Sequence, residues 1–72
     1  MKDGTTPLHR AAGWAKREVA ELLIAKGADV NATTRNGFTP LDTAIRRKHP
    51  ETADLLRKHD GKTGAELKAE GK

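Results

Sequence analysis

The chain has 72 residues, which is enough for one small domain. It contains no cysteine, so disulfides and cysteine-based zinc or iron–sulfur sites are excluded. The 14 lysine and arginine residues exceed the 10 aspartate and glutamate residues, for a net charge of +4, but the two signs are interspersed, which favours an ordinary charged surface over one built for nucleic acid.

The N-terminus has no apolar run after Met1, and no stretch approaches the ~20 apolar residues of a transmembrane helix. The sequence therefore predicts neither a secretory signal nor membrane insertion. We expect a soluble, cytoplasmic protein without membrane contact.

The first helix is predicted to begin at Thr6-Pro7 and to run to about Trp14. A threonine hydroxyl can accept a hydrogen bond from a backbone N–H of the first helical turn. Proline is tolerated at the first helical position because the N–H that it lacks would have no partner in the helix. A second helix is predicted from about Arg17 to Lys26, where apolar residues recur at helical spacing and Gly27 follows as a stop. Each helix is too short to be stable alone, so the two are expected to pack as an antiparallel pair.

Residues 28–37 do not follow a helical pattern. Val30, Ala32 and Thr34 alternate with polar residues, and Asn36-Gly37 is a strong turn signal. We predict an extended finger that is closed by a β-turn at Thr34 to Gly37.

The phrase Gly4-Thr5-Thr6-Pro7-Leu8 returns 33 residues later as Gly37-Phe38-Thr39-Pro40-Leu41. Self-similarity at such a period indicates a stacked array of repeats. The second unit therefore starts a helix at Thr39-Pro40, and Pro50 begins its second helix.

The second unit has the features of a terminal repeat. Arg57 and Lys58 stand where the first unit has Ile24 and Ala25, so the outward face becomes polar. Beyond it, Thr63 and a glutamate three residues later have the spacing of a capping box. That spacing predicts a short final helix ending at about residue 71, with a frayed tail as the alternative.

These phrases together resemble an ankyrin repeat. The likeness rests on Gly4-x-Thr6-Pro7-Leu8-His9-x-Ala11-Ala12, on Leu22-Leu23, and on Gly27-Ala28-Asp29-Val30-Asn31-Ala32. It implies an all-α, ankyrin-type solenoid of paired antiparallel helices with a β-turn finger between repeats. It also implies one domain over residues 1–72, with repeat one at about 2–34, repeat two at about 35–62, and a capping helix or tail at 63–72.

Two features depart from the ankyrin pattern. Ala15 and Lys48 stand where a glycine usually separates the paired helices, so a left-handed backbone there would carry strain on the order of 1 kcal/mol. The array also has two units, whereas stacked repeats usually need at least three. We therefore expect either a fragment of a longer array or a homo-oligomer that covers the leading face of the first unit. The residues expected on that face are Leu8, Val19, Leu23 and Ile24.

No catalytic or metal-binding pattern is found. The chain has no cysteine, serine or tyrosine, and the histidines His49 and His59 have no partners at ligand spacing. The ankyrin resemblance implies that His9 bonds the Thr6 hydroxyl and a neighbouring backbone group; the alternative is a metal ligand or a catalytic base. We expect no enzyme activity and no cofactor.

The resemblance places the variable positions on the concave and finger surface. Trp14 and Phe38 are the only aromatic residues, and aromatics near arginine are typical of interface hot spots. The alternative for Trp14 is that it folds onto the aliphatic stems of Lys16 and Arg47. The residues expected to bind a partner are Thr5, Trp14, Thr33, Arg35, Asn36, Phe38, Arg46 and Arg47, and Lys2 and Asp3 lie on the same surface.

The sequence thus favours a protein-interaction module whose arginines attract an acidic partner protein. Two other classes stay open. One is a structural or self-assembling fragment without a separate ligand. The other, which the mixed charge pattern disfavours, is nucleic-acid binding by the basic surface.

Overall fold

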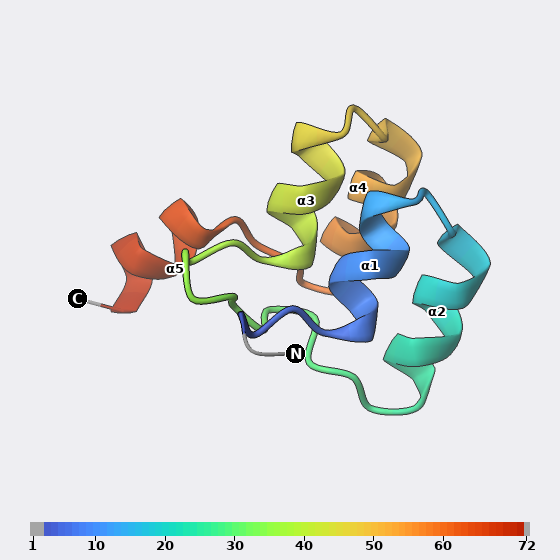
Figure 1. The fold of residues 1–72 in the computed structure, drawn as a ribbon, viewed down its shortest axis with the longest axis horizontal. Helices are drawn as coiled ribbons and strands as arrows, with labels where there is room; N and C mark the ends of the chain where they lie inside the picture. The colour runs from blue at the N-terminus through green and yellow to red at the C-terminus, as the bar shows by residue number, and fades with distance from the viewer. Residues whose placement is uncertain (1–2, 72) are drawn as a thin grey trace.

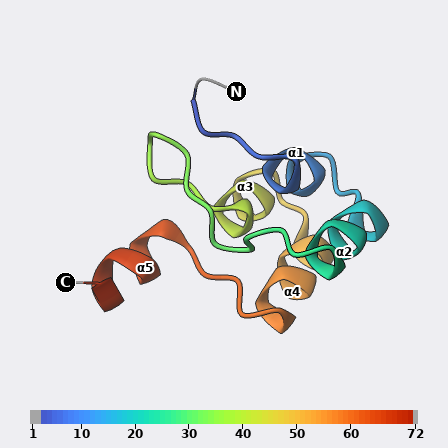
Figure 2. The ribbon, with the colours of Figure 1, turned by 90° about the horizontal axis from the view of Figure 1, so that it is seen from below.

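A computed structural model describes residues 3–71, and every element within them is a helix (Figure 1). In chain order these are α1 (Pro7–Gly13), α2 (Arg17–Ala25), α3 (Pro40–Arg46), α4 (Pro50–Lys58) and α5 (Gly64–Gly71). Helices α1 and α3 lie side by side in one layer, and α2 and α4 form the layer behind them (Figures 1 and 2). The expected all-α solenoid of helix pairs is confirmed.

The Thr-Pro phrases start helices as predicted. Thr6 caps α1 and Thr39 caps α3, each with extended backbone and with proline in the first turn. The hydroxyl of each threonine accepts the N–H of the residue three positions later, and the side chain of that later residue accepts the N–H of the threonine. This reciprocal pair of bonds satisfies donors that a helix N-terminus otherwise leaves without partners.

The core is made of leucines and alanines. Alanine at the helix contacts lets neighbouring helices approach closely. Within the α1–α3 layer, a Cβ on Gly13 would lie 3.2 Å from the Thr43 methyl group. The buried apolar residues are Leu8, Ala11, Ala12, Ala20, Leu41, Ala44 and Leu56. A stack of such short helices is stable because this small core is continuous between the two units.

The segment between α2 and α3 forms the predicted finger. Gly37 donates its N–H to the Thr34 carbonyl at 2.9 Å, which closes the β-turn, and Thr34 donates its N–H to the Phe38 carbonyl at 2.9 Å. The finger also meets the segment before α1, because Arg35 donates its N–H to the Asp3 carbonyl at 2.8 Å. These bonds fix the finger next to the starts of α1 and α3.

The expected left-handed residues are found between the paired helices. Ala15 has φ of 57° and Lys48 has φ of 61°. The conformation reverses the chain so that Lys16 and His49 each donate an N–H back to the preceding helix, at 2.9 Å. Asp60, with φ of 67°, is a third case that the sequence reasoning missed.

The C-terminal residues form a helix, not a frayed tail. Lys62 donates its N–H to Asn31 Oδ1 at 2.7 Å, and its carbonyl oxygen accepts the Thr39 hydroxyl at 2.6 Å. Gly64 donates its N–H to Asp42 Oδ2 at 2.7 Å. None of the α5 residues is fully buried. Polar bonds at its start therefore hold α5 on the second unit.

Charged pairs strengthen this attachment. Glu66 accepts the Thr63 N–H at 2.9 Å and the Arg57 guanidinium at 2.7 Å, and these bonds hold the pKa of Glu66 below its ordinary value. Lys62 pairs with Glu70 at 2.6 Å, which raises the pKa of Lys62. Both pairs are exposed to solvent, so each contributes little to stability.

We predict that Gly64→Ala loosens α5. A Cβ on Gly64 would lie 2.0 Å from the Gly37 carbonyl oxygen, so the helix start must shift and lose its bond to Asp42. Overpacking of this kind is expected to lower the free energy of unfolding by about 1–3 kcal/mol in urea titrations. Gly71→Ala in the same helix meets nothing within 4 Å and serves as the control; equal effects of the two changes would contradict this account of α5.

We further predict that Lys48→Gly stabilises the fold. Glycine adopts positive φ without a Cβ penalty, so the free energy of unfolding should rise by about 0.5–1 kcal/mol, measured by urea titration. Glu21→Gly, on the exposed side of α2, should instead lower it by about 1 kcal/mol. A loss of stability in Lys48→Gly would show that the left-handed turn is not strained.

Candidate functional site

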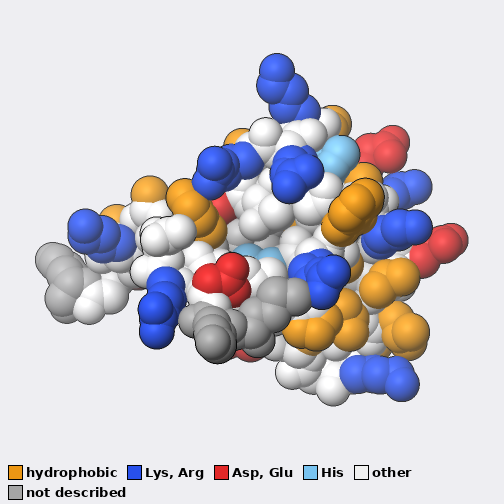
Figure 3. All heavy atoms as spheres, in the orientation of Figure 1, with side chains coloured by type: hydrophobic (Ala, Val, Ile, Leu, Met, Phe, Trp, Pro, Cys, Tyr) orange, Lys and Arg blue, Asp and Glu red, His pale blue; other side chains and the backbone are white. Residues whose placement is uncertain are grey.

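A groove runs across the face of α1 and α3 and is bordered by the finger. Its volume is about 380 Å³. Lysine and arginine side chains gather on the α1–α3 face that Figure 3 shows. The residues that line the groove are Asp3, Thr5, His9, Arg10, Trp14, Thr34, Asn36, Phe38, Thr43, Arg46 and Arg47. Four separate segments of the chain thus meet in one concave surface.

The groove brings together six of the eight residues predicted to bind a partner, all except Thr33 and Arg35. Those two are exposed on the finger but do not line the groove. Lys2 lies outside the described residues. Sequence reasoning missed Arg10 and Thr43, although each stands four positions before the predicted residue that directly follows its helix, the spacing at which side chains share a face.

Trp14 is the more exposed of the two aromatic side chains in the groove. It directly follows α1, and 72% of its surface is open to solvent. This exposure is too large for the alternative in which the stems of Lys16 and Arg47 cover the indole ring. Trp14 and Arg47 hold the same position in consecutive units and line the same groove.

Phe38 and Arg46 form a stacked pair at the finger side of the groove. The Arg46 guanidinium carbon lies 4.6 Å from the centre of the Phe38 ring. Attraction between a cation and the face of an aromatic ring is worth about 0.5–1 kcal/mol at an exposed site. The contact holds the guanidinium in place at the edge of the groove.

His9 fixes the backbone of the finger beneath this pair. Its Nε2 lies 2.8 Å from the Phe38 carbonyl oxygen, which can only accept, so Nε2 carries the proton. Its Nδ1 then accepts the Thr6 N–H at 3.1 Å and the Thr6 hydroxyl at 2.8 Å. Both ring nitrogens are therefore used in the fold, as the ankyrin resemblance implies, and neither is available to a metal or a substrate.

Positive charge predominates in the groove. Arg10, Arg46 and Arg47 face a single carboxylate, that of Asp3. Asp3 accepts the Thr5 N–H at 2.9 Å, and this bond lowers the pKa of Asp3. The salt bridges among residues 3–71 lie elsewhere: Arg17–Glu51, Arg57–Glu66 and Lys62–Glu70. The groove arginines thus have no carboxylate partner within the described chain.

The leading face of the first unit differs from the expectation. Leu8 is only 1% exposed because it lies in the core cluster, so its assignment to an open face is wrong. Leu23 and Ile24 are half-buried against the same core. The large exposed apolar residues of α2 are Val19, at 47%, and Leu22, at 56%. The sequence reasoning did not assign Leu22 to this face.

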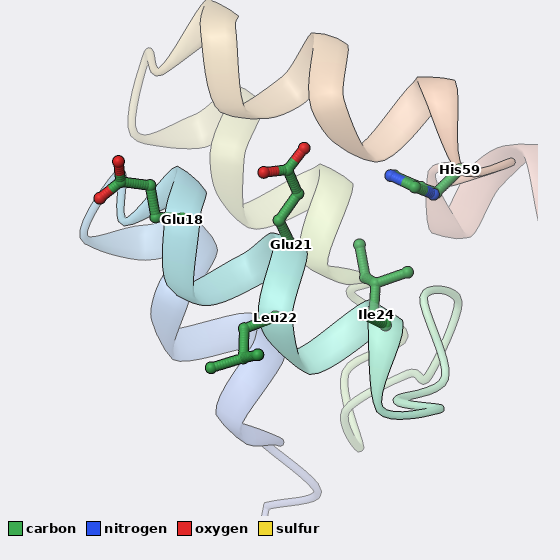
Figure 4. Close-up of a pocket in the computed structure, with 6 residues that line it drawn as sticks. Glu18, Glu21, Leu22, Ile24 and His59 are labelled. Atoms are coloured by element: carbon green, nitrogen blue, oxygen red, sulfur yellow. The ribbon is translucent and has the colours of Figure 1, made fainter.

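A wider depression, of about 680 Å³, lies on the opposite layer between α2 and the end of α4. Figure 4 shows Glu18 and Glu21 pointing in different directions from α2, while His59 approaches from α4. The carboxylates do not converge on the histidine, so the depression has no acid–base pair. Within residues 3–71 there is also no cluster of three side chains suited to a metal ion.

The helix pairs, the finger and the bonds between helix starts define an α-solenoid of short repeats. A family model described as ankyrin repeats (3 copies) matches residues 1–70. The chain belongs to the ankyrin repeat family. The two complete helix pairs account for two copies, and α5 follows them with a third capping box at Thr63 and Glu66.

Curated relatives match this chain over a small part of their own length. Mouse Rabankyrin-5 is 43% identical over 58 residues, 81% of this chain and 5% of the relative. Human ARF GTPase-activating protein GIT1 is 47% identical over 53 residues, 74% of this chain and 7% of the relative. The rice potassium channel AKT1 is 38% identical over 64 residues, 89% of this chain and 7% of the relative. The chain thus spans less than a tenth of the length of these relatives.

Within residues 3–71, no helix has the length and apolar character needed to span a bilayer.

Proposed function

We propose that this chain is a protein-interaction module that binds a partner protein through the groove on α1, α3 and the finger. Ankyrin repeats generally mediate protein–protein interactions, and the relatives are a Rabankyrin, a GTPase-activating protein and a channel. Their names denote different activities, while the shared segment is the repeat. We therefore transfer only the binding role to this chain, and propose neither catalysis nor a cofactor.

The observation that carries this proposal is the exposure of Trp14 in a concave surface that also holds three arginines. Tryptophan and arginine are enriched among the interface residues whose truncation to alanine costs the most binding free energy. An indole that is open to solvent in the free protein gains apolar burial when a partner covers it.

The excess of positive charge favours an acidic partner. Complementary charge speeds association and selects against basic proteins, although exposed pairs add little affinity. We also propose that the protein is cytoplasmic and meets this partner there. Nucleic acid is the less favoured partner, because the positive charge of the chain is interspersed with negative charge.

A second candidate function is self-association, and the exposure of α2 favours it. Val19 and Leu22 are open, but of their counterparts in the second unit Thr52 is 1% exposed and Leu55 is half-buried against the core. The same repeat positions are thus less exposed in the unit that has another unit packed in front of it. A second copy that pairs through this face would cover them.

We predict that Trp14→Ala weakens binding of a groove ligand at least tenfold, because truncating a buried aromatic anchor typically costs more than about 2 kcal/mol. Ligands are selected from a random peptide display library against the whole chain and measured by fluorescence polarisation. Lys58→Ala, at an exposed position at the end of α4 outside the groove, is the control. Ligands that bind both variants equally would place the interaction elsewhere.

For self-association, we predict a concentration-dependent dimer in sedimentation equilibrium at micromolar concentrations. Leu22→Glu should abolish the dimer, because it places a charge on the open α2 face, while Ala69→Glu on the exposed side of α5 should leave it intact. A stable monomer across the whole range would remove this candidate and leave the groove proposal untouched.

A further inference from the structure

We propose that Arg46, stacked on Phe38, is the carboxylate-binding centre of the groove and that its ligand is an Asp or Glu side chain in an acidic peptide segment. This inference rests on the proposed function, since it names the chemical group that the groove recognises.

The N–H edge of Arg46 makes no hydrogen bond within residues 3–71. The guanidinium carbon lies over the Phe38 ring, 4.6 Å from the ring centre, and such a cation–ring contact needs no N–H acceptor. None of the hydrogen bonds or salt bridges within residues 3–71 involves an Arg46 side-chain nitrogen. A carboxylate fits such an edge with two parallel hydrogen bonds.

The support under Arg46 is rigid. The Phe38 carbonyl accepts His9 Nε2–H at 2.8 Å and the Thr34 N–H at 2.9 Å, and the Phe38 N–H is donated to Thr34 Oγ1 at 3.2 Å. Every backbone hydrogen-bonding group of Phe38 is thus in use. A donor that is oriented before the ligand arrives loses less side-chain entropy on binding than a free arginine does.

The surroundings of Arg46 extend the preference from one carboxylate to an acidic segment. Arg10 and Arg47 line the same groove without carboxylate partners, and Trp14 offers an exposed ring for an apolar neighbour of the acidic residue. The salt bridges elsewhere show that Arg57 and Lys62 do pair with carboxylates where these are within reach. The groove arginines can therefore pair with the carboxylates of a ligand without breaking a salt bridge within residues 3–71.

A peptide explains this arrangement better than a nucleic acid does. Single strands bind by stacking bases on open aromatic faces along a basic groove. Here Arg46 lies over the face of Phe38, which leaves Trp14 as the one open aromatic ring, and Asp3 adds negative charge to the groove. Phe38 therefore supports Arg46 and does not offer its ring to a nucleic-acid base.

The test uses peptides selected from the display library against the whole chain, each made also with Gln for Glu and Asn for Asp. We expect the selected peptides to be enriched in acidic residues and the amide versions to bind at least tenfold more weakly. Arg46→Lys keeps the charge but removes the planar fork, and Phe38→Leu keeps an apolar side chain but removes the ring. Each is expected to weaken the acidic peptide about tenfold, with little further loss in the double variant, because both changes break one unit.

Arg17→Lys, an exposed arginine at the start of α2 outside the groove, is the matched control and should bind as the parent does. Circular dichroism melts confirm that each variant is folded. Amide versions that bind as tightly as the acidic peptides would overturn the inference, and so would additive losses from Phe38→Leu and Arg46→Lys. Tighter binding of a phosphoserine version or of a single-stranded oligonucleotide would also overturn it.

The two proposals fail in different ways. Selected peptides that lack acidic residues but depend on Trp14 would leave the groove function standing and remove only the carboxylate site. Peptides that bind regardless of Trp14, Arg46 and Phe38 would remove both. Enrichment of acidic peptides that depend on Arg46 supports both.

Discussion

The structure depends on one bond that links the start of each unit to the next. Its helices are seven to nine residues long, which is too short to persist alone in water. The helix starts must therefore be held to one another. In the first unit His9 makes this link, because one ring nitrogen closes the cap of its own helix at Thr6 and the other reaches the Phe38 carbonyl. A single buried side chain thus satisfies polar groups in two repeats.

The second unit makes the corresponding link with the opposite polarity. Asp42 stands where the first unit has His9, and its Oδ2 accepts the Thr39 N–H and the Gly64 N–H. A histidine N–H requires a carbonyl, which the finger offers, whereas a carboxylate requires an N–H, which the start of a helix offers. The carboxylate also lies at the positive end of the α5 dipole. The side chain at this one position therefore matches the segment that it contacts, which is the finger for His9 and a helix start for Asp42.

Sequence reasoning succeeded where local chemistry decides the structure. The Thr-Pro starts and the β-turn at Thr34 to Gly37 each follow from one or two residues. The positive φ of Ala15 and Lys48 follows only from the ankyrin pattern, because neither residue type favours that backbone. It failed for Leu8, whose burial depends on packing between units that no local pattern contains. The groove could be predicted only in part. Repeat alignment found the residues that vary between units, but the stacking of Arg46 on Phe38 requires the finger and α3 to be in place.

The same link explains how a repeated scaffold carries a variable site. His9 bonds the backbone of Phe38 and not its side chain, so the fold fixes this position while its side chain remains free to differ between units. The first unit has Thr5 there, and the second has the aromatic ring that supports Arg46. Gly13 and Arg46 occupy the same repeat position, as do Trp14 and Arg47. Two units of one plan thus form a groove whose sides differ in chemistry, because the bonds that build the fold use the backbone and leave the side chains to determine which ligand binds.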